Sequence, residues 1–91
     1  MTVEVRIPTM MRPDAGGQAT AQANGSTVAE VLEDLVLQFP RLQGKFTNED
    51  GSLHKFVNVY VNDEDVRYLE RLDTKVADGD EIAILPAVAG G

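Results

Sequence analysis

The chain has 91 residues, a length that predicts one small domain with a modest core and is too short for two domains. Of these residues 43% are hydrophobic and 25% are charged, as in globular proteins. Eight basic and 15 acidic residues give a net charge of −7, which argues against nucleic acid as a partner because phosphates attract basic surfaces. No apolar run approaches the roughly 20 residues of a membrane helix and no signal-peptide pattern is present, so we expect a cytoplasmic protein with no membrane partner.

Two segments of alternating polarity begin the chain. Thr2–Pro8 has three branched apolar residues on one face, which predicts a half-buried strand. Thr9–Gly17 is rich in turn residues and predicts a loop, in which Met10 and Met11 are expected to pack over an edge of the core rather than contact a partner. Gln18–Ala23 alternates again, so the two strands predict a hairpin.

A helix is predicted after the turn at Asn24-Gly25. Thr27 is a good N-cap, and Glu30 three residues later completes a capping-box pattern. Pro40 marks the end, because the residue before a proline disfavours helical backbone. Apolar residues at helical spacing form one stripe: Val28, Val31, Leu32, Leu35 and Phe39.

Three further strands are expected in the second half. Phe56–Val61 has the strongest strand pattern in the chain, with three valines on one face. Asn62–Asp65 is predicted to be a turn and Val66–Tyr68 a brief strand. The tight turn Asp78–Asp80 then leads into the last strand, Glu81–Pro86.

This order of elements predicts an α+β fold, a mixed sheet of about five strands with one main helix packed across one face. We expect residues 1–86 to form this domain. The face opposite the helix would then present Phe56, Tyr60 and Leu85 to water. If contiguous, these side chains would form a docking patch for a partner. The alternative is that they are scattered surface hydrophobes, which need no explanation.

No catalytic or metal-binding pattern accompanies this fold. The chain has no cysteine, so it cannot itself hold sulfur as a thiol or persulfide, and its single histidine, His54, has no serine partner. The carboxylate runs at residues 63–65 and 78–81 fall in predicted turns, and a calcium site would need more ligands. We therefore expect no metal and no cofactor bound by this chain, and a substrate or carrier protein rather than an enzyme.

The sequence ends in Ala87, Val88, Ala89, Gly90 and Gly91, none of which has an ionisable side chain. A terminal carboxylate has a pKa of about 3.5, so it is ionised at neutral pH and must be activated before it can take part in acyl transfer. Two glycines without a Cβ suit a backbone that threads a narrow crevice. We expect residues 87–91 to be a flexible tail that enters a partner's active site, with an extended reach of roughly 16–18 Å.

Several motifs together resemble a known family, the ubiquitin-like sulfur carriers of the ThiS, MoaD and CysO type. The resemblance covers nearly the whole chain, is closest to the CysO branch, and implies the ubiquitin-like β-grasp fold. MoaD-type chains commonly have a second proline and a serine before Gly-Gly, where this chain has Ala87 and Ala89. The motifs that carry the resemblance are Ile7-Pro8-Thr9, Arg12-Pro13, Gly16-Gly17-Gln18, Phe56-Val57-Asn58, Tyr60 to Arg67, and Leu85 to Gly91.

The resemblance implies a mechanism in which partner enzymes act on Gly91. A ubiquitin-activating-like adenylyltransferase/sulfurtransferase would use ATP to adenylate its carboxylate, and a sulfur donor would displace AMP to leave a thiocarboxylate. In the CysO branch, a pyridoxal-phosphate-dependent cysteine synthase accepts the sulfur, and a zinc-dependent peptidase then releases cysteine. There are three alternatives. The chain could be a carrier for molybdopterin, thiamin or a specialised metabolite, a ubiquitin-like modifier of lysines, or a plain interaction domain.

Overall fold

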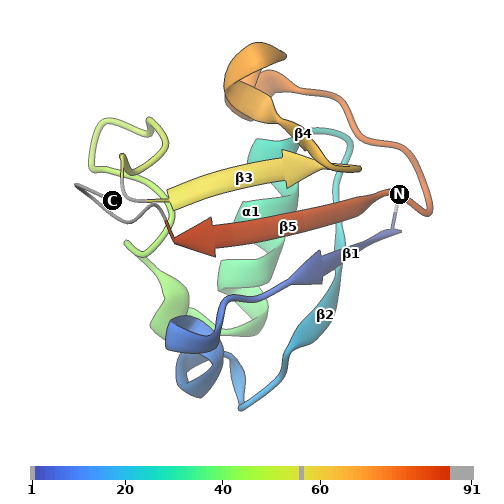
Figure 1. Ribbon diagram of the computed structural model, residues 1–91. Helices are drawn as coiled ribbons and strands as arrows, with labels where there is room; N and C mark the ends of the chain where they lie inside the picture. Colours follow the sequence, from blue (N-terminus) through green and yellow to red (C-terminus); the bar gives the residue numbers. More distant parts are fainter. Residues whose placement is uncertain (1, 56, 87–91) are drawn as a thin grey trace.

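The computed structural model describes residues 2–55 and 57–86. Five strands form one mixed sheet of order β2-β1-β5-β3-β4, and helix α1 (Val28–Gln38) crosses one face of it (Figure 1). Only the β1–β5 pair is parallel within these residues. The expected α+β class and its mixed sheet of five strands are confirmed. The strands are β1 (Thr2–Arg6), β2 (Thr20–Asn24), β3 (Val57–Val61), β4 (Glu64–Asp65) and β5 (Glu81–Pro86).

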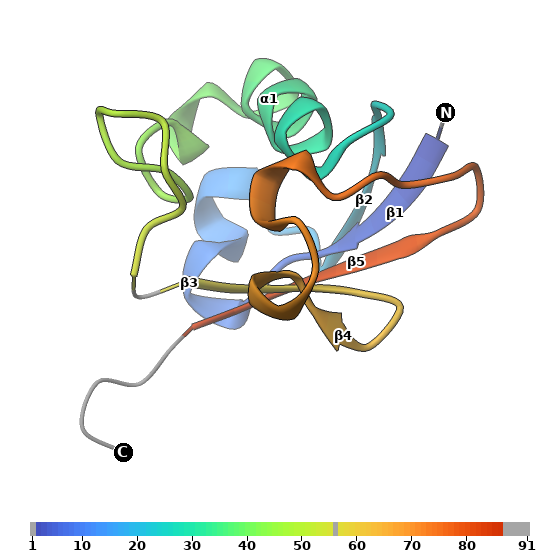
Figure 2. The same cartoon turned by 90° about the horizontal axis from the view of Figure 1, so that it is seen from above.

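The core lies between the sheet and α1, which form two layers (Figure 2). Successive side chains of a strand point to opposite faces, so every second residue of β1, β3 and β5 points towards the helix. The helix in turn buries one stripe of its surface against them. The predicted inner face of the sheet and the predicted stripe of α1 are both confirmed as buried. The sheet residues are Val3, Val5, Ile7, Val57, Val59, Val61, Ile82 and Ile84. The helix residues are Val28, Val31, Leu32 and Leu35.

The start of α1 follows the predicted cap with one change. The side-chain oxygen of Thr27 accepts a hydrogen bond from the Glu30 amide at 3.2 Å, as an N-cap should. The Glu30 carboxylate does not return to Thr27; it accepts from the amide and the hydroxyl of Ser26, at 2.8 and 2.7 Å. The helix has 11 residues, and no helix within residues 2–55 and 57–86 is long and apolar enough to cross a membrane.

The predicted loop at Thr9–Gly17 contains a 3₁₀ helix, η1 (Thr9–Ala15). Met11 and Ala15 are buried on its inner side, and Gly16 ends it with a φ of 67°, a left-handed conformation that favours glycine. Three shorter 3₁₀ helices follow α1, and they are η2 (Pro40–Leu42), η3 (Val66–Tyr68) and η4 (Arg71–Asp73).

The prediction of a strand at Val66–Tyr68 is wrong, because this segment is η3 and the strand β4 comes just before it, at Glu64–Asp65. The predicted four-residue turn is shorter than expected, since Asn62 and Asp63 have φ values of 48° and 72° and reverse the chain by themselves. The Asp65 carboxylate then accepts a hydrogen bond from the Arg67 amide at 2.9 Å, which closes a turn in place of an extended strand.

Candidate functional site

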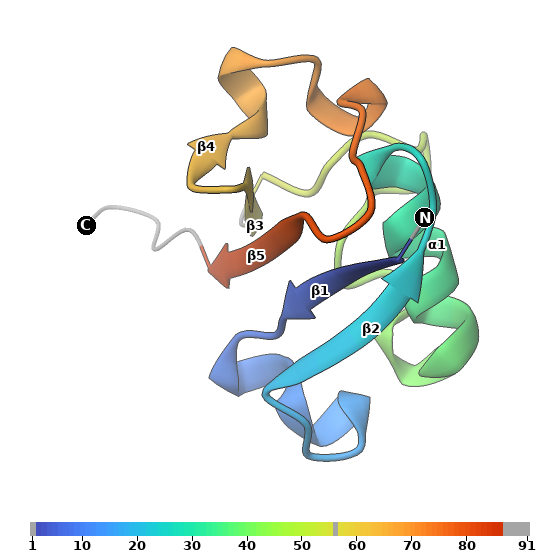
Figure 3. The ribbon, with the colours of Figure 1, turned by 90° about the vertical axis from the view of Figure 1, so that its right-hand side faces the viewer.

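The candidate site is the root of the C-terminal tail, where β5 ends. This strand lies between β1 and β3 and hydrogen-bonds to both, parallel to the first and antiparallel to the second (Figure 3). Its last residue, Pro86, stands opposite Val57. The predicted acyl-transfer residue Gly91, the other tail residues Ala87 to Gly90, and the predicted docking residue Phe56 lie outside the residues that the structure describes.

The other two predicted docking residues, Tyr60 and Leu85, share the face of the sheet opposite α1, which faces the viewer in Figure 1. Tyr60 stands opposite Ala83, and Leu85 stands opposite Asn58 on the same pair of strands. Tyr60 and Leu85 are therefore diagonal neighbours, close enough for large side chains to form one surface. Leu85 is 47% exposed on this face.

This face is hollowed beside the tail root. A shallow depression of about 680 Å³ has Tyr60, Leu85 and Pro86 on one side and Met10 of η1 on the other. Met10 is 67% exposed, whereas Met11 is 7% exposed. The expectation that both methionines pack over the core is thus right for Met11 and wrong for Met10. Sequence reasoning missed Met10 as a site residue because adjacent positions of a 3₁₀ helix point in different directions, which a predicted loop does not reveal.

Charged side chains complete the depression. Arg6, from β1, forms a loose ion pair with Glu81 at 3.7 Å, and both side chains are largely exposed. Such a pair contributes little to stability, so Arg6 is free to exchange partners. Arg12, from η1, is more firmly held, because its Nε donates a hydrogen bond to the carbonyl oxygen of Ile7 at 3.0 Å. Asp63 lies on the β3 side of the same depression.

The carboxylate run at residues 78–81 lies at a turn, as predicted, whereas Glu64 and Asp65 of the other run form β4. Asp78 accepts a hydrogen bond from the Thr2 amide at 2.9 Å, and Asp80 accepts one from the Ala77 amide at 2.7 Å. That second hydrogen bond, with a further one to the Asn62 side chain, lowers the pKa of Asp80. Among the described residues there is no group of three or more histidines, aspartates or glutamates that could hold a metal ion.

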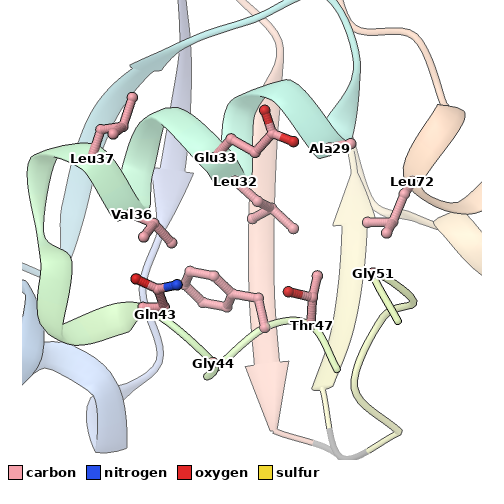
Figure 4. A pocket seen from close by; sticks show the side chains of 11 residues that line it. Ala29, Leu32, Glu33, Val36, Leu37, Gln43, Gly44, Thr47, Gly51 and Leu72 are labelled. Atoms are coloured by element: carbon pink, nitrogen blue, oxygen red, sulfur yellow. The ribbon is translucent and has the colours of Figure 1, made fainter. Parts of the chain in front are cut away.

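A second concavity lies on the helix side of the molecule, between α1 and the segment that follows η2 (Figure 4). It has a volume of about 500 Å³, and apolar side chains such as Val36, Phe46 and Leu72 line most of it. Glu33 is the one ionisable side chain among its lining residues. This groove opens on the side of the molecule opposite the depression.

Comparisons with known proteins agree on one family. Residues 5–91 match the ThiS family. The chain is 48% identical over 93 residues to the sulfur carrier protein CysO of Mycobacterium tuberculosis, with full coverage of both chains. It superposes on a chain of the Amycolatopsis orientalis BexX/CysO complex with a TM-score of 0.90 and 46% identity, covering 98% of this chain and 99% of that one. It is also 34% identical to small archaeal modifier protein 1 of Haloferax volcanii, over 97% of this chain and 88% of that protein.

Proposed function

Because the chain belongs to the ThiS family, we propose that it is a sulfur carrier protein whose working group is the carboxylate of Gly91. The observation that carries the proposal is the similarity to CysO along the full length of both chains. The geometry supports it: the strand β5 ends at Pro86, from which residues 87–91 lead to the terminal carboxylate. The domain of residues 1–86 would present the tail of residues 87–91 to partner enzymes.

The carboxyl group of Gly91 reacts in two steps. A carboxylate oxygen attacks the α-phosphorus of ATP, and pyrophosphate leaves to give an acyl-adenylate. A sulfur donor then attacks the carbonyl carbon, the bond to the AMP oxygen breaks, and AMP leaves with the electron pair. When the donor is hydrosulfide, as in the assay described below, loss of its proton leaves the thiocarboxylate directly. The ATP belongs to a ubiquitin-activating-like adenylyltransferase/sulfurtransferase, since this chain supplies only the acyl group.

The described residues would position the tail on the partner enzyme, and they would take no part in the bond-forming steps. Pairing with β3 over residues 82–86, and with β1 over residues 81–83, fixes β5, so the root of the tail would have a defined place on the partner. Tyr60 and Leu85 would dock against the partner beside that root. Positioning matters because a displacement of about 1 Å at a reacting centre can cost a factor of about 100 in rate.

The similarity to CysO favours cysteine as the final product. The thiocarboxylate sulfur would displace the leaving group of an activated serine derivative on a pyridoxal-phosphate-dependent cysteine synthase, which would leave the cysteine product attached to Gly91. A zinc-dependent peptidase would then hydrolyse that bond and regenerate the carrier. Molybdopterin, thiamin and a specialised metabolite are the other acceptors for which the same thiocarboxylate is suited.

The experiment that tests the carrier mechanism is deletion of Gly91. Wild-type protein and the truncated chain are incubated with the activating enzyme, ATP and a sulfide source, and their intact masses are measured. Wild type should gain the mass difference between sulfur and oxygen. The truncated chain should keep its carboxylate mass, because its carbonyl lies back by roughly 3.5 Å, and also its melting temperature. Equal thiocarboxylate formation by both would overturn the mechanism.

A second candidate function is protein modification, favoured by the similarity to small archaeal modifier protein 1. A modifier would share the adenylation step but would end in an isopeptide bond to lysine. The two functions differ in product, so a tagged carrier expressed in its native cell separates them. A ladder of lysine conjugates on a denaturing gel indicates a modifier, and a free thiocarboxylate without conjugates indicates a carrier.

A further inference from the structure

We propose that the depression beside the tail root is a contact site for partner enzymes, in which Met10 and Arg12 of η1 receive an apolar side chain and a neighbouring carboxylate of the partner. This inference rests on the proposed carrier function and extends it. Docking would then involve η1 as well as the open face of the sheet. The side chains of this 3₁₀ helix would therefore help to determine which enzymes accept the carrier.

The exposure of Met10 is imposed by the packing of its own helix. Met11 and Ala15 are buried on the inner side of η1, and the Met11 amide donates a hydrogen bond to the Pro8 carbonyl at 2.9 Å. Met10 is thereby held outward, facing the depression that Leu85 lines from β5. These are two of the exposed large hydrophobic residues of the described chain, and they come from opposite ends of the sequence.

An exposed methionine suits a surface that receives more than one partner. Its unbranched thioether adapts to apolar groups of different shape, which is why methionine is frequent on adaptable binding surfaces. A carrier needs such a surface, because the enzyme that activates the tail and the enzyme that accepts the sulfur must both approach the same root. Leu85 and Tyr60 offer a firmer apolar surface on the other side of the depression.

Arg12 gives the depression its polar specificity. Its Nε is occupied by the Ile7 carbonyl, which fixes the guanidinium beside the depression. The ion pairs of the described residues involve Arg6, Arg41, Lys45 and Arg67, and none involves Arg12. A guanidinium offers several N–H donors in a fixed plane, a geometry that matches a carboxylate.

The occupant that fits these features is a segment of a protein partner with an apolar side chain next to an aspartate or glutamate. Nucleic acid is a poor fit, because the chain has a net charge of −7. A small metabolite is also a poor fit, since the depression is open rather than enclosed. Any enzyme that takes the tail into its active site must cover the surface where β5 ends, so this depression lies next to the place where such an enzyme binds.

Calorimetric titration of the full chain into BexX, the protein in complex with CysO from Amycolatopsis orientalis, tests the proposal. Met10→Ala should weaken binding about tenfold, as truncation of an interface anchor does. The matched control is Leu37→Ala, because Leu37 is 79% exposed but lines the groove beside α1. The control should change the dissociation constant by less than about twofold, and melting curves of both variants should overlay that of wild type.

A second pair of variants tests the charge. Arg12→Gln keeps an amide donor for the Ile7 carbonyl but removes the cation, so its binding should be weaker and depend less on salt than wild-type binding. Arg12→Lys keeps the charge without the planar fork, so it should retain the salt dependence and recover only part of the affinity. A purely structural role of Arg12 would change the melting temperature and leave the salt dependence intact.

Three results would overturn the proposal: wild type that does not bind BexX, Met10→Ala binding as tightly as wild type, or Leu37→Ala losing as much affinity as Met10→Ala. The proposed function fails separately. If deletion of Gly91 leaves thiocarboxylate formation intact while Met10→Ala weakens binding, the contact site stands and the carrier mechanism falls. If deletion of Gly91 abolishes thiocarboxylate formation and Met10→Ala binds normally, the mechanism stands and the contact site falls.

Discussion

Ile84 and Leu85 are consecutive residues of β5 whose side chains lie on opposite faces of the sheet. Ile84 is 1% exposed and packs under α1, whereas Leu85 is 47% exposed on the open face. The period of two along a strand explains the contrast. This pair therefore allows stability and docking to be separated by truncations made one residue apart.

Ile84→Ala should lower the free energy of unfolding by about 2–5 kcal/mol, because it leaves a cavity in the core. Leu85→Ala should change it far less, but should cost about 2 kcal/mol in binding to the activating enzyme if Leu85 is an interface anchor. Urea unfolding and a binding titration on both variants check this. A large loss of stability in Leu85→Ala with unchanged binding would contradict the docking role.

Thr27→Ala should lower the free energy of unfolding by about 1 kcal/mol, since it removes the oxygen that caps the Glu30 amide at the start of α1. Thr27→Ser keeps that oxygen and serves as the control, with most of the wild-type stability expected. Urea unfolding at neutral pH measures both. Equal stability of the alanine and serine variants would show that solvent caps the helix as well as Thr27 does.

Gly25→Ala should be destabilising for a steric reason. A Cβ at this position would lie 2.7 Å from the Val31 amide nitrogen and 2.8 Å from the Cβ of Glu30, both on the first turns of α1. Backbone atoms cannot move aside as a flexible side chain can, so the start of the helix must shift. We expect a loss of about 1–3 kcal/mol, typical of overpacking, measured by thermal unfolding. An unchanged melting temperature would contradict the close packing of this turn on the helix.

The pKa of Asp80 is lowered by its hydrogen bonds to the Ala77 amide and the Asn62 side chain. A group with a depressed folded-state pKa stabilises the fold above its unfolded pKa of about 3.9 and loses that contribution as the pH falls through the folded value. Asp80→Asn should therefore be less stable than wild type at pH 7, with the difference shrinking below a pH of about 4.

Glu49→Gln is the charge-matched control for this experiment. Glu49 is exposed, and its carboxylate has no hydrogen bond to any of the described residues. Its effect on the free energy of unfolding should be small, because the side chain is exposed. Urea titrations from pH 2.5 to 7 on both variants give the comparison. A constant difference between Asp80→Asn and wild type across that range would contradict the assigned cause.

The sequence predicted the elements whose pattern repeats. Alternating valines identified β1 and β3, and Thr27 located the start of α1 to the residue, because capping and periodicity are local properties. The segment Val66–Tyr68 was mispredicted for the opposite reason. Valine and tyrosine favour strands on average, but hydrogen bonds from Arg67 to the Asp65 carboxylate bend the chain into η3.

The candidate site was predictable in part. The alternation of side chains between the two faces of β3 and β5 was enough to place Tyr60 and Leu85 on one face. The structure brings these two side chains together beside the tail root. Met10 and Arg12 could not be predicted as site residues, because their place beside β5 depends on how η1 packs against the end of β1. That packing depends on contacts between distant parts of the chain, which no local pattern contains.

The parallel pairing of β1 and β5 has a mechanical consequence. A partner that draws on the tail applies force along the axis of β5, and the hydrogen bonds to β1 and β3 lie across that axis. They are therefore loaded in shear, so many must break together before the strand slides, whereas a strand peeled from an edge loses them one at a time. The strand that leads into the tail can therefore bear a pull along its axis without being peeled from the sheet.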